Sequence, residues 1–248
     1  MSHAKAGLQP GPGRELWTTG VAFAVVTFGL WHWAGMALGL LIVPLLGYAL
    51  LASLVASGLA GAYRIGAANR ITFYRALGVL ILAAGLADPY AAVSQQWFWA
   101  SLAMAILILD GVDGYLARRL NASSDFGARF DMEVDAALTM TLCLGVWMLG
   151  VAGAWVLMLG LMRYAFVAAG WVWPWVNRPL PESVRRKIIC VWQIASLVIA
   201  LLPVTPASAA VWILALALAL LAYSFTVDLA WLYRAGGHHE SDGHGTET

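Results

Sequence analysis

Residues 110–135 read DGVDGYLARRLNASSDFGARFDMEVD, and the sequence on either side of this stretch is almost uninterruptedly apolar. Asp110 and Asp113 are three positions apart, so on a helix they share one face. Asp131 and Asp135 are four positions apart and share a face in the same way. The polar residues between the two pairs are typical of a turn, and two helices joined there would bring all four carboxylates together.

These carboxylates would repel one another, and ionised groups at membrane depth are costly, so the site needs a cation. Oxygen ligands favour Mg²⁺, Mn²⁺ or Ca²⁺ over zinc or copper, and the stretch contains no histidine or cysteine. Gly114 and Gly127 leave the backbone open to a phosphate group, and Arg118 offers planar donors to phosphate oxygens. A solvated charged loop between two membrane helices is the simpler alternative, but it has no reason to keep this spacing.

In pattern form the stretch is DxxDGxxAR, eight residues, then GxxxDxxxD, with Ala117 and Arg118 completing the first half. This pattern resembles the signature of the CDP-alcohol phosphotransferases at every fixed position. Members of that family are membrane enzymes that displace CMP from a CDP-linked lipid with the hydroxyl of an alcohol. The resemblance therefore implies a phospholipid synthase that transfers a phosphatidyl group from CDP-diacylglycerol to a small alcohol.

The resemblance also implies roles for individual residues. Asp110, Asp113 and Asp131 would hold two Mg²⁺ or Mn²⁺ ions, and Asp135 would lie near the metals and act as the general base. The residues bordering the nucleotide and its diphosphate would be Gly114, Ala117, Arg118 and Gly127.

Two further segments resemble family segments outside the signature. The first resembles PNxIT…R, with Ala68 in place of the proline; its matching residues are Asn69, Ile71, Thr72 and Arg75. This match suggests that Asn69 and Thr72 also border the nucleotide. The second resembles GKxKTxxQ through Lys187 and Gln193, while Arg186, Ile189 and Cys190 replace the glycine, the second lysine and the threonine. The resemblance covers residues 66–234.

Composition independently predicts an all-α, polytopic membrane bundle. The chain is 62% hydrophobic and only 11% charged, with a mean hydropathy of +0.79, which argues against a water-soluble domain. We expect about eight transmembrane helices, each long enough to cross roughly 30 Å of hydrocarbon. Their expected ranges are 16–33, 37–61, 71–87, 91–118, 127–149, 153–173, 188–203 and 207–233.

The expected helices divide the chain into three parts. Residues 1–65 would form an N-terminal extension with two transmembrane helices, and residues 66–234 a catalytic domain of six helices. Residues 235–248 are polar, glycine-rich and contain histidines, which is typical of a disordered tail. Gly35 and Gly39 form a GxxxG pair that could support a homodimer, although such pairs are common by chance in a chain with 25 glycines.

The basic residues predict the orientation, because short cytoplasmic loops collect lysine and arginine. Every lysine and arginine except Arg163 falls near helix ends assigned to one side, and the opposite turns carry none. We therefore expect both termini and the acidic hairpin to face the cytoplasm of a bacterial inner membrane. A net charge of +1 and the lack of a nucleic-acid motif argue against a nucleic-acid partner.

Arg163 lies about ten residues inside an apolar helix, where an arginine needs an anion or a carboxylate. It could form a salt bridge to an aspartate of the motif. Alternatively Arg163 and the cluster of Arg185, Arg186 and Lys187 could form the pocket for the acceptor or for the donor phosphates. An acceptor phosphate in this pocket would favour glycerol 3-phosphate or an inositol phosphate over choline, serine or another alcohol. Bacterial phosphatidylcholine synthases are also eight-helix members, but their signature spacing is longer than the one seen here.

Two functions of other classes remain open from the sequence. An ion-coupled transporter could also bury aspartates and an arginine among eight helices, but the fixed glycine spacing and the lack of an inverted repeat argue against it. An inactive relative that acts as a scaffold is disfavoured by the intact set of aspartates.

Overall fold

The computed structural model describes residues 12–58, 67–120, 125–178, 180–181 and 183–241, although the side chains at 12, 58, 67–68, 112–120, 125, 174 and 235–241 lie outside the description. Across these residues the regular structure is helical and contains no strand, which confirms the all-α prediction. The chain divides into two compact units, Met1–Asp135 and Ala136–Thr248, and α6 contributes to both. Each unit is described by itself.

The first unit begins with α1 (Pro12–Ala34) and α2 (Leu38–Gly58), which are joined by a tight turn. Gly35 ends α1 with φ +65°, a left-handed conformation that glycine adopts at little cost. The Met36 amide then donates to the carbonyl of Trp31 (3.2 Å), as is common at helix ends that close on a glycine. The reversal predicted near this position is therefore present.

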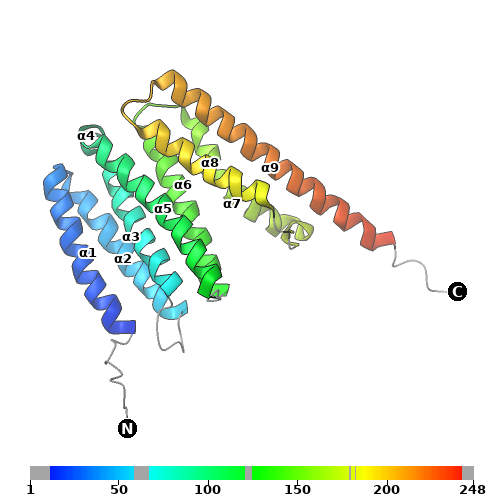
Figure 1. Cartoon of the computed structure of the whole chain (residues 1–248), viewed down its shortest axis with the longest axis horizontal. Helices are drawn as coiled ribbons and strands as arrows, with labels where there is room; N and C mark the ends of the chain where they lie inside the picture. Colours follow the sequence, from blue (N-terminus) through cyan, green and yellow to red (C-terminus); the bar gives the residue numbers. More distant parts are fainter. Residues whose placement is uncertain (1–11, 59–66, 121–124, 179, 182, 242–248) are drawn as a thin grey trace, which may run out of the picture. The chain divides into compact units, whose positions relative to one another are not determined.

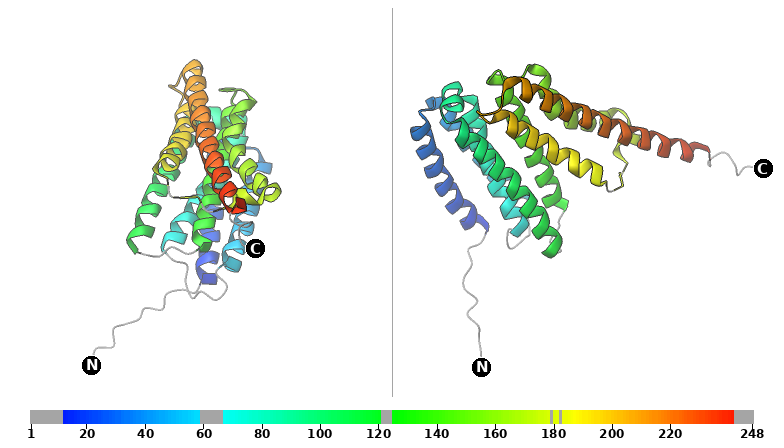
Figure 2. Two further views of the ribbon diagram at one scale, coloured as in Figure 1. Left: turned by 90° about the vertical axis from the view of Figure 1, so that its right-hand side faces the viewer. Right: turned by 45° about the horizontal axis from the view of Figure 1, so that its top comes forward.

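The helix α3 (Ala67–Ala87) packs against α2 on one side and α5 (Gln96–Leu120) on the other, as Figures 1 and 2 show. Buried Phe23, Val55, Phe73 and Leu77 form a core between α1, α2 and α3, and Phe130 from the start of α6 (Asp125–Met148) packs against it. This core places α3 beside the beginning of α6, where two of the aspartates lie.

A short helix, α4 (Pro89–Ser94), separates α3 from α5. The sequence analysis expected one helix over residues 91–118, but the chain breaks at Gln95, which has φ −116° and ψ 28°. At the break the Gln95 amide donates to the Ala91 carbonyl, and the buried Trp99 indole donates to the same oxygen at 2.9 Å. Residues 96–120 then form a separate helix.

The second unit contains the remainder of α6, α7 (Leu157–Val172), α8 (Val184–Leu201) and α9 (Ala207–Ser241), with the 3-10 turns η1 (Ala154–Val156) and η2 (Pro174–Asn177). The helix α9 packs against both α8 and α7. It continues to Ser241, past the expected helix end at residue 233, and residues 242–248 of the expected tail lie outside the described residues.

Four of the described helices are long and apolar enough to cross a membrane: Leu38–Ser57, Asn69–Ala87, Ala154–Val172 and Ala207–Arg234. Large apolar side chains such as Leu46 and Trp212 are exposed on these helices, as expected for surfaces that face lipid. The expected class, a helical protein with several membrane spans, is confirmed. The number of eight crossings stays a prediction.

Candidate active site

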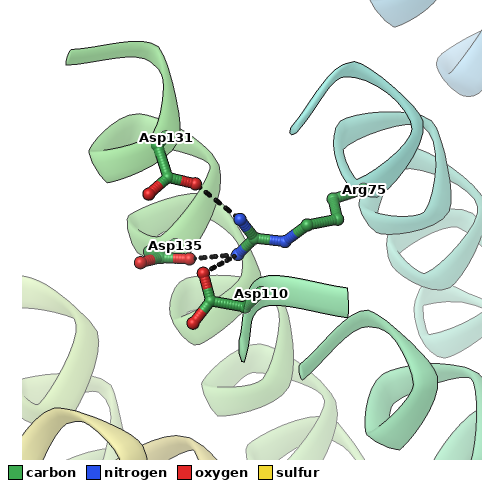
Figure 3. A network of polar contacts seen from close by, with 4 residues as sticks. All are labelled: Arg75, Asp110, Asp131 and Asp135. Carbon is green, nitrogen blue, oxygen red and sulfur yellow. Dashed lines mark hydrogen bonds and ion pairs between the residues drawn. The ribbon is translucent and has the colours of Figure 1, made fainter. Parts of the chain in front are cut away.

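The centre of the site is an arginine surrounded by carboxylates (Figure 3). Arg75 extends from α3, Asp110 from α5, and Asp131 and Asp135 from successive turns of α6. All four residues belong to the first compact unit. Three helices that are distant in sequence therefore meet at one charged cluster.

Close packing of α3 on α5 explains how Arg75 reaches Asp110. A Cβ added to Gly78 would lie 3.1 Å from the side chain of Ile106, so the missing side chain allows the two helices to approach closely. Gly78 is three residues after Arg75, and Ile106 is four residues before Asp110. The ion pair thus lies one helical turn from the point of closest packing.

The arginine contacts each carboxylate through one oxygen. Its Nη2 atom lies 2.9 Å from Oδ1 of Asp110, and its Nη1 atom donates to Oδ1 of Asp131 at 2.5 Å. Nη2 also donates to Oδ1 of Asp135 in a short contact. Figure 3 shows the other oxygen of each carboxylate turned away from the guanidinium.

Burial differs sharply within this cluster. The Arg75 side chain is 0% exposed, whereas the side chains of Asp110, Asp131 and Asp135 are 28%, 39% and 27% exposed. The arginine therefore lies at the closed side of the site, and the carboxylates form its open side. A soluble ion or substrate would meet the carboxylates and not the guanidinium.

The three carboxylates fit a hard divalent cation. One oxygen from each of Asp110, Asp131 and Asp135 lies within 4.8 Å of the others. The donor set consists of oxygen atoms only, which is the set preferred by Mg²⁺ and Mn²⁺. Because Arg75 supplies a single positive charge to three negative ones, the cluster still has an excess of negative charge that a metal ion can neutralise. The site could therefore hold a metal ion.

The fourth predicted metal ligand and three predicted nucleotide contacts cannot be placed at the level of their side chains. The backbone of α5 is helical through them, but their side chains lie outside the described residues. They are Asp113, Gly114, Ala117 and Arg118.

The remaining predicted nucleotide residues lie on two helices of the first unit. Asn69 and Thr72 are both on α3; Thr72 is one helical turn before Arg75 and shares its face, whereas Asn69 is six positions before Arg75 and lies about a third of a turn away from that face. Thr72 is buried, and Asn69 is half-buried near the start of the helix. Gly127 is in the first turn of α6, one turn before Asp131. These placements are compatible with the expected roles but do not test them.

The three predicted acceptor residues belong to the second unit. Arg163 is in the middle of α7, while Arg186 and Lys187 are in the first turn of α8. The Arg186 guanidinium donates to the carbonyl of Pro181. Their roles, and the alternative pairing of Arg163 with an aspartate of the motif, stay predictions.

Two further polar residues of α8, Arg185 and Gln193, have helix-joining contacts that the sequence did not indicate. Arg185 donates to Oδ1 of Asp228 at 2.6 Å and to the Ser224 carbonyl at 2.9 Å, which joins α8 to α9. Gln193 is buried, and its Nε2 atom donates to the Leu159 carbonyl at 2.8 Å, which joins α8 to α7. Gln193, which matches a family segment, thus has a helix-packing contact.

Sequence reasoning also missed the position of Arg75 and a second ion pair on α3. Arg75 entered only as part of a family segment and as one of the basic residues near helix ends, although an arginine inside an apolar helix is itself a signal that a carboxylate is near. Arg70 binds Glu15 of α1 through two contacts, Nε to Oε1 at 2.6 Å and Nη2 to Oε2 at 2.7 Å. No local pattern could reveal this pair, because 55 positions separate its members.

Comparison with known proteins agrees with the geometry. The family model for CDP-alcohol phosphatidyltransferases matches residues 65–223, which include Arg75 and the whole aspartate stretch. No curated protein and no solved structure matches the chain. The resemblance seen in the motif is confirmed, and because the match extends over more than half of the 248 residues, the chain belongs to the CDP-alcohol phosphatidyltransferase family.

Proposed function

We propose that this protein is a phospholipid synthase that transfers a phosphatidyl group from CDP-diacylglycerol to a small alcohol and releases CMP. Family membership supports transfer from a CDP-alcohol to an acceptor. The observation that carries the proposal is the convergence of Asp110, Asp131 and Asp135, whose oxygens lie within 4.8 Å of one another at a partly exposed site. Such a cluster suits a substrate that carries phosphates and a metal ion.

In this proposal Asp110, Asp131 and Asp135, together with Asp113, hold two Mg²⁺ or Mn²⁺ ions. When bound, the ions neutralise the charge of the diphosphate and of the departing CMP. Removal of the carboxylate of Asp110, Asp113 or Asp131 would weaken binding of the ions, because each ligand contributes charge to a shared site. The exposed edge formed by the carboxylates is where the diphosphate would enter.

The chain's own residues would then position and deprotonate the acceptor. The acceptor hydroxyl oxygen forms a new bond to the phosphorus of the phosphatidyl group, and the bond from that phosphorus to CMP breaks. Asp135 takes the hydroxyl proton. Its ion pair with Arg75 leaves the second carboxylate oxygen directed away from the guanidinium, which suits a proton acceptor (Figure 3). Asn69, Thr72 and Gly127 would border the nucleotide.

We further propose that the acceptor carries a phosphate group, such as glycerol 3-phosphate or an inositol phosphate. Arg163, Arg186 and Lys187 supply the positive charges for it. Each charged contact to a phosphate contributes roughly 1.5–3 kcal/mol, so Arg163→Gln or Lys187→Gln should raise the acceptor KM about tenfold to a hundredfold and change the donor KM little. Unchanged acceptor kinetics would instead favour choline, serine or another uncharged or cationic alcohol.

The direct test measures CMP release by the purified protein with CDP-diacylglycerol, Mg²⁺ or Mn²⁺, and a panel of alcohols, with product lipids identified by mass. Asp110→Asn and Asp131→Asn should lose most activity. Asp135→Asn should keep donor binding and lose turnover, since it removes a base more than a ligand. Asp228→Asn is the matched control, because Asp228 also pairs with an arginine but lies on α9, outside the cluster.

The outcomes separate the classes of function. CMP release that depends on the divalent ion and on the cluster aspartates would support the proposal. No CMP release with any alcohol, accompanied by ion uptake in vesicles, would favour the transporter. CMP release that survives in all three cluster variants would contradict the assigned site.

A further inference from the structure

We propose that Arg75 is a built-in cation of the aspartate cluster, which holds the carboxylates together without metal and is antagonistic to the divalent ion that binds them. This inference rests on the metal site in the proposed function. It assigns Arg75 as a positioning residue, which acts on the substrate only through Asp110, Asp131 and Asp135. Arg75 and the metal are thus alternative sources of positive charge for one set of oxygens.

The first support is the completeness of the contacts. The two terminal nitrogens of Arg75 contact one oxygen on each of three carboxylates from two helices. Without this side chain, three carboxylates whose oxygens lie within 4.8 Å of one another would lose the cation that they share. Their mutual repulsion would push α5 and α6 apart at this level.

The second support is burial. Arg75 is 0% exposed, so it cannot serve as a surface contact for a phosphate that enters from the open side. Its helix is held in place on both sides, by the core of Phe23, Val55, Phe73 and Leu77 and by the close approach of Gly78 to Ile106. The guanidinium is therefore fixed in position as part of the scaffold.

The third support is the geometry of the shared oxygens. A magnesium ion binds carboxylate oxygens at about 2.0–2.1 Å, whereas Arg75 nitrogens lie 2.5 Å from Oδ1 of Asp131 and 2.9 Å from Oδ1 of Asp110. An ion on these same oxygens would share them with the guanidinium, and the two positive charges would repel each other at short range. An ion on the outward oxygens would still be repelled by the fixed charge behind them. Either arrangement makes Arg75 and the ion oppose each other.

The test compares thermal unfolding of detergent-solubilised wild type and Arg75→Gln by tryptophan fluorescence across a Mn²⁺ titration. Without metal, Arg75→Gln should unfold at a lower temperature than wild type. Its Tm should rise more with Mn²⁺, and half of the rise should occur at a roughly tenfold lower Mn²⁺ concentration, because a competing charge has been removed. Arg70→Gln is the matched control, since Arg70 is on the same helix but pairs with Glu15, outside the cluster.

Several outcomes would overturn the proposal. It fails if Mn²⁺ stabilises Arg75→Gln by the same amount and at the same concentration as wild type, or if the variant binds Mn²⁺ more weakly. The second result would mean that Arg75 arranges the aspartates in favour of the metal. If Mn²⁺ stabilises neither wild type nor Arg70→Gln, the metal site of the proposed function fails instead, whatever Arg75 does.

Arg75→Lys keeps the test decisive if Arg75→Gln does not fold. Lysine keeps the charge but offers one nitrogen in place of two contact points, so the charge lies close to fewer carboxylates and opposes an ion on the others less strongly. A Mn²⁺ midpoint below that of wild type supports the antagonism, and a midpoint equal to or above it overturns the antagonism.

Discussion

Asp88 joins two chain reversals at one end of the first unit, and its replacement should cost more stability than an exposed capping residue would. Its Oδ1 atom accepts from the amides of Tyr90 and Ala91, and its Oδ2 atom accepts from the amide of Ala37, all at 3.0 Å. Asp88 is the N-cap of α4 and is only 8% exposed. The Ala37 contact attaches the α1–α2 turn to the α3–α4 turn.

The magnitude follows from two losses in Asp88→Ala. Loss of an N-cap costs about 1 kcal/mol, and leaving the Ala37 amide without its acceptor costs roughly 1–3 kcal/mol. A total of about 2–4 kcal/mol should lower Tm by roughly 5–15 °C for a chain of this size. Asp88→Asn keeps an acceptor oxygen and should lose less.

The measurement is thermal unfolding followed by tryptophan fluorescence in one detergent and at one heating rate, because membrane proteins often unfold irreversibly. Ser94→Ala is the control, since Ser94 is exposed on the same short helix and contacts only its own turn. A Tm for Asp88→Ala within about 2 °C of wild type would refute the reasoning.

The dependence on pH gives a second check. Hydrogen bonds from the backbone amides of Ala91 and Ala37 lower the pKa of Asp88 below its usual value of 3.8. A carboxyl whose folded pKa is depressed stabilises the protein fully above the unfolded pKa, and this contribution is lost as the pH falls through the folded pKa. The advantage of wild type over Asp88→Asn should therefore be full at pH 7 and smaller at about pH 3.

Three further predictions concern packing and topology. Gly85→Ala should lower the free energy of unfolding by about 1–3 kcal/mol, because the added Cβ would lie 2.3 Å from the ring of buried Trp99. An unchanged Tm in thermal unfolding would contradict this packing. Gln193→Ala should lose roughly 1–3 kcal/mol of unfolding free energy, because it removes a buried side chain together with its hydrogen bond to the Leu159 carbonyl. The KM of both substrates should stay unchanged, and a raised donor KM would instead indicate a substrate contact. The orientation can be tested with Tyr90→Cys, at an exposed position, in a Cys190→Ser background that removes the exposed native cysteine. The new thiol should react with an impermeant thiol reagent only from outside the cell, and reaction only from the cytoplasm would reverse the proposed orientation.

The aspartate cluster was predictable because spacing along one helix determines which residues share a face. That rule pairs Asp131 with Asp135, and the helical hairpin predicted from the polar residues between the two pairs anticipated that Asp110 would lie near them. The rule contains no information about which third helix packs on the pair. The contact of Arg75 with all three carboxylates depends on the α3–α5 packing at Gly78, which no local pattern specifies.

Helix boundaries show the same division between local and tertiary causes. The turn at Gly35 was predictable, since glycine ends helices by adopting a left-handed conformation. The interruption at Gln95 was missed although Ser94, Gln95 and Gln96 form a short polar run at the break, and the Trp99 indole donates to the Ala91 carbonyl across it. The contacts of Asp88 with Ala37 and of Glu15 with Arg70 join positions more than 50 residues apart.

The position of Arg75 on α3 has a consequence for how the protein is made. Chains are synthesised from the N-terminus, so α3 enters the membrane before the helices that carry Asp110, Asp131 and Asp135. The long arginine side chain can extend toward the nearby interface until its partners arrive. Each acidic helix then meets a positive charge that is already in place, and assembly of the cluster does not have to wait for a supply of metal ions.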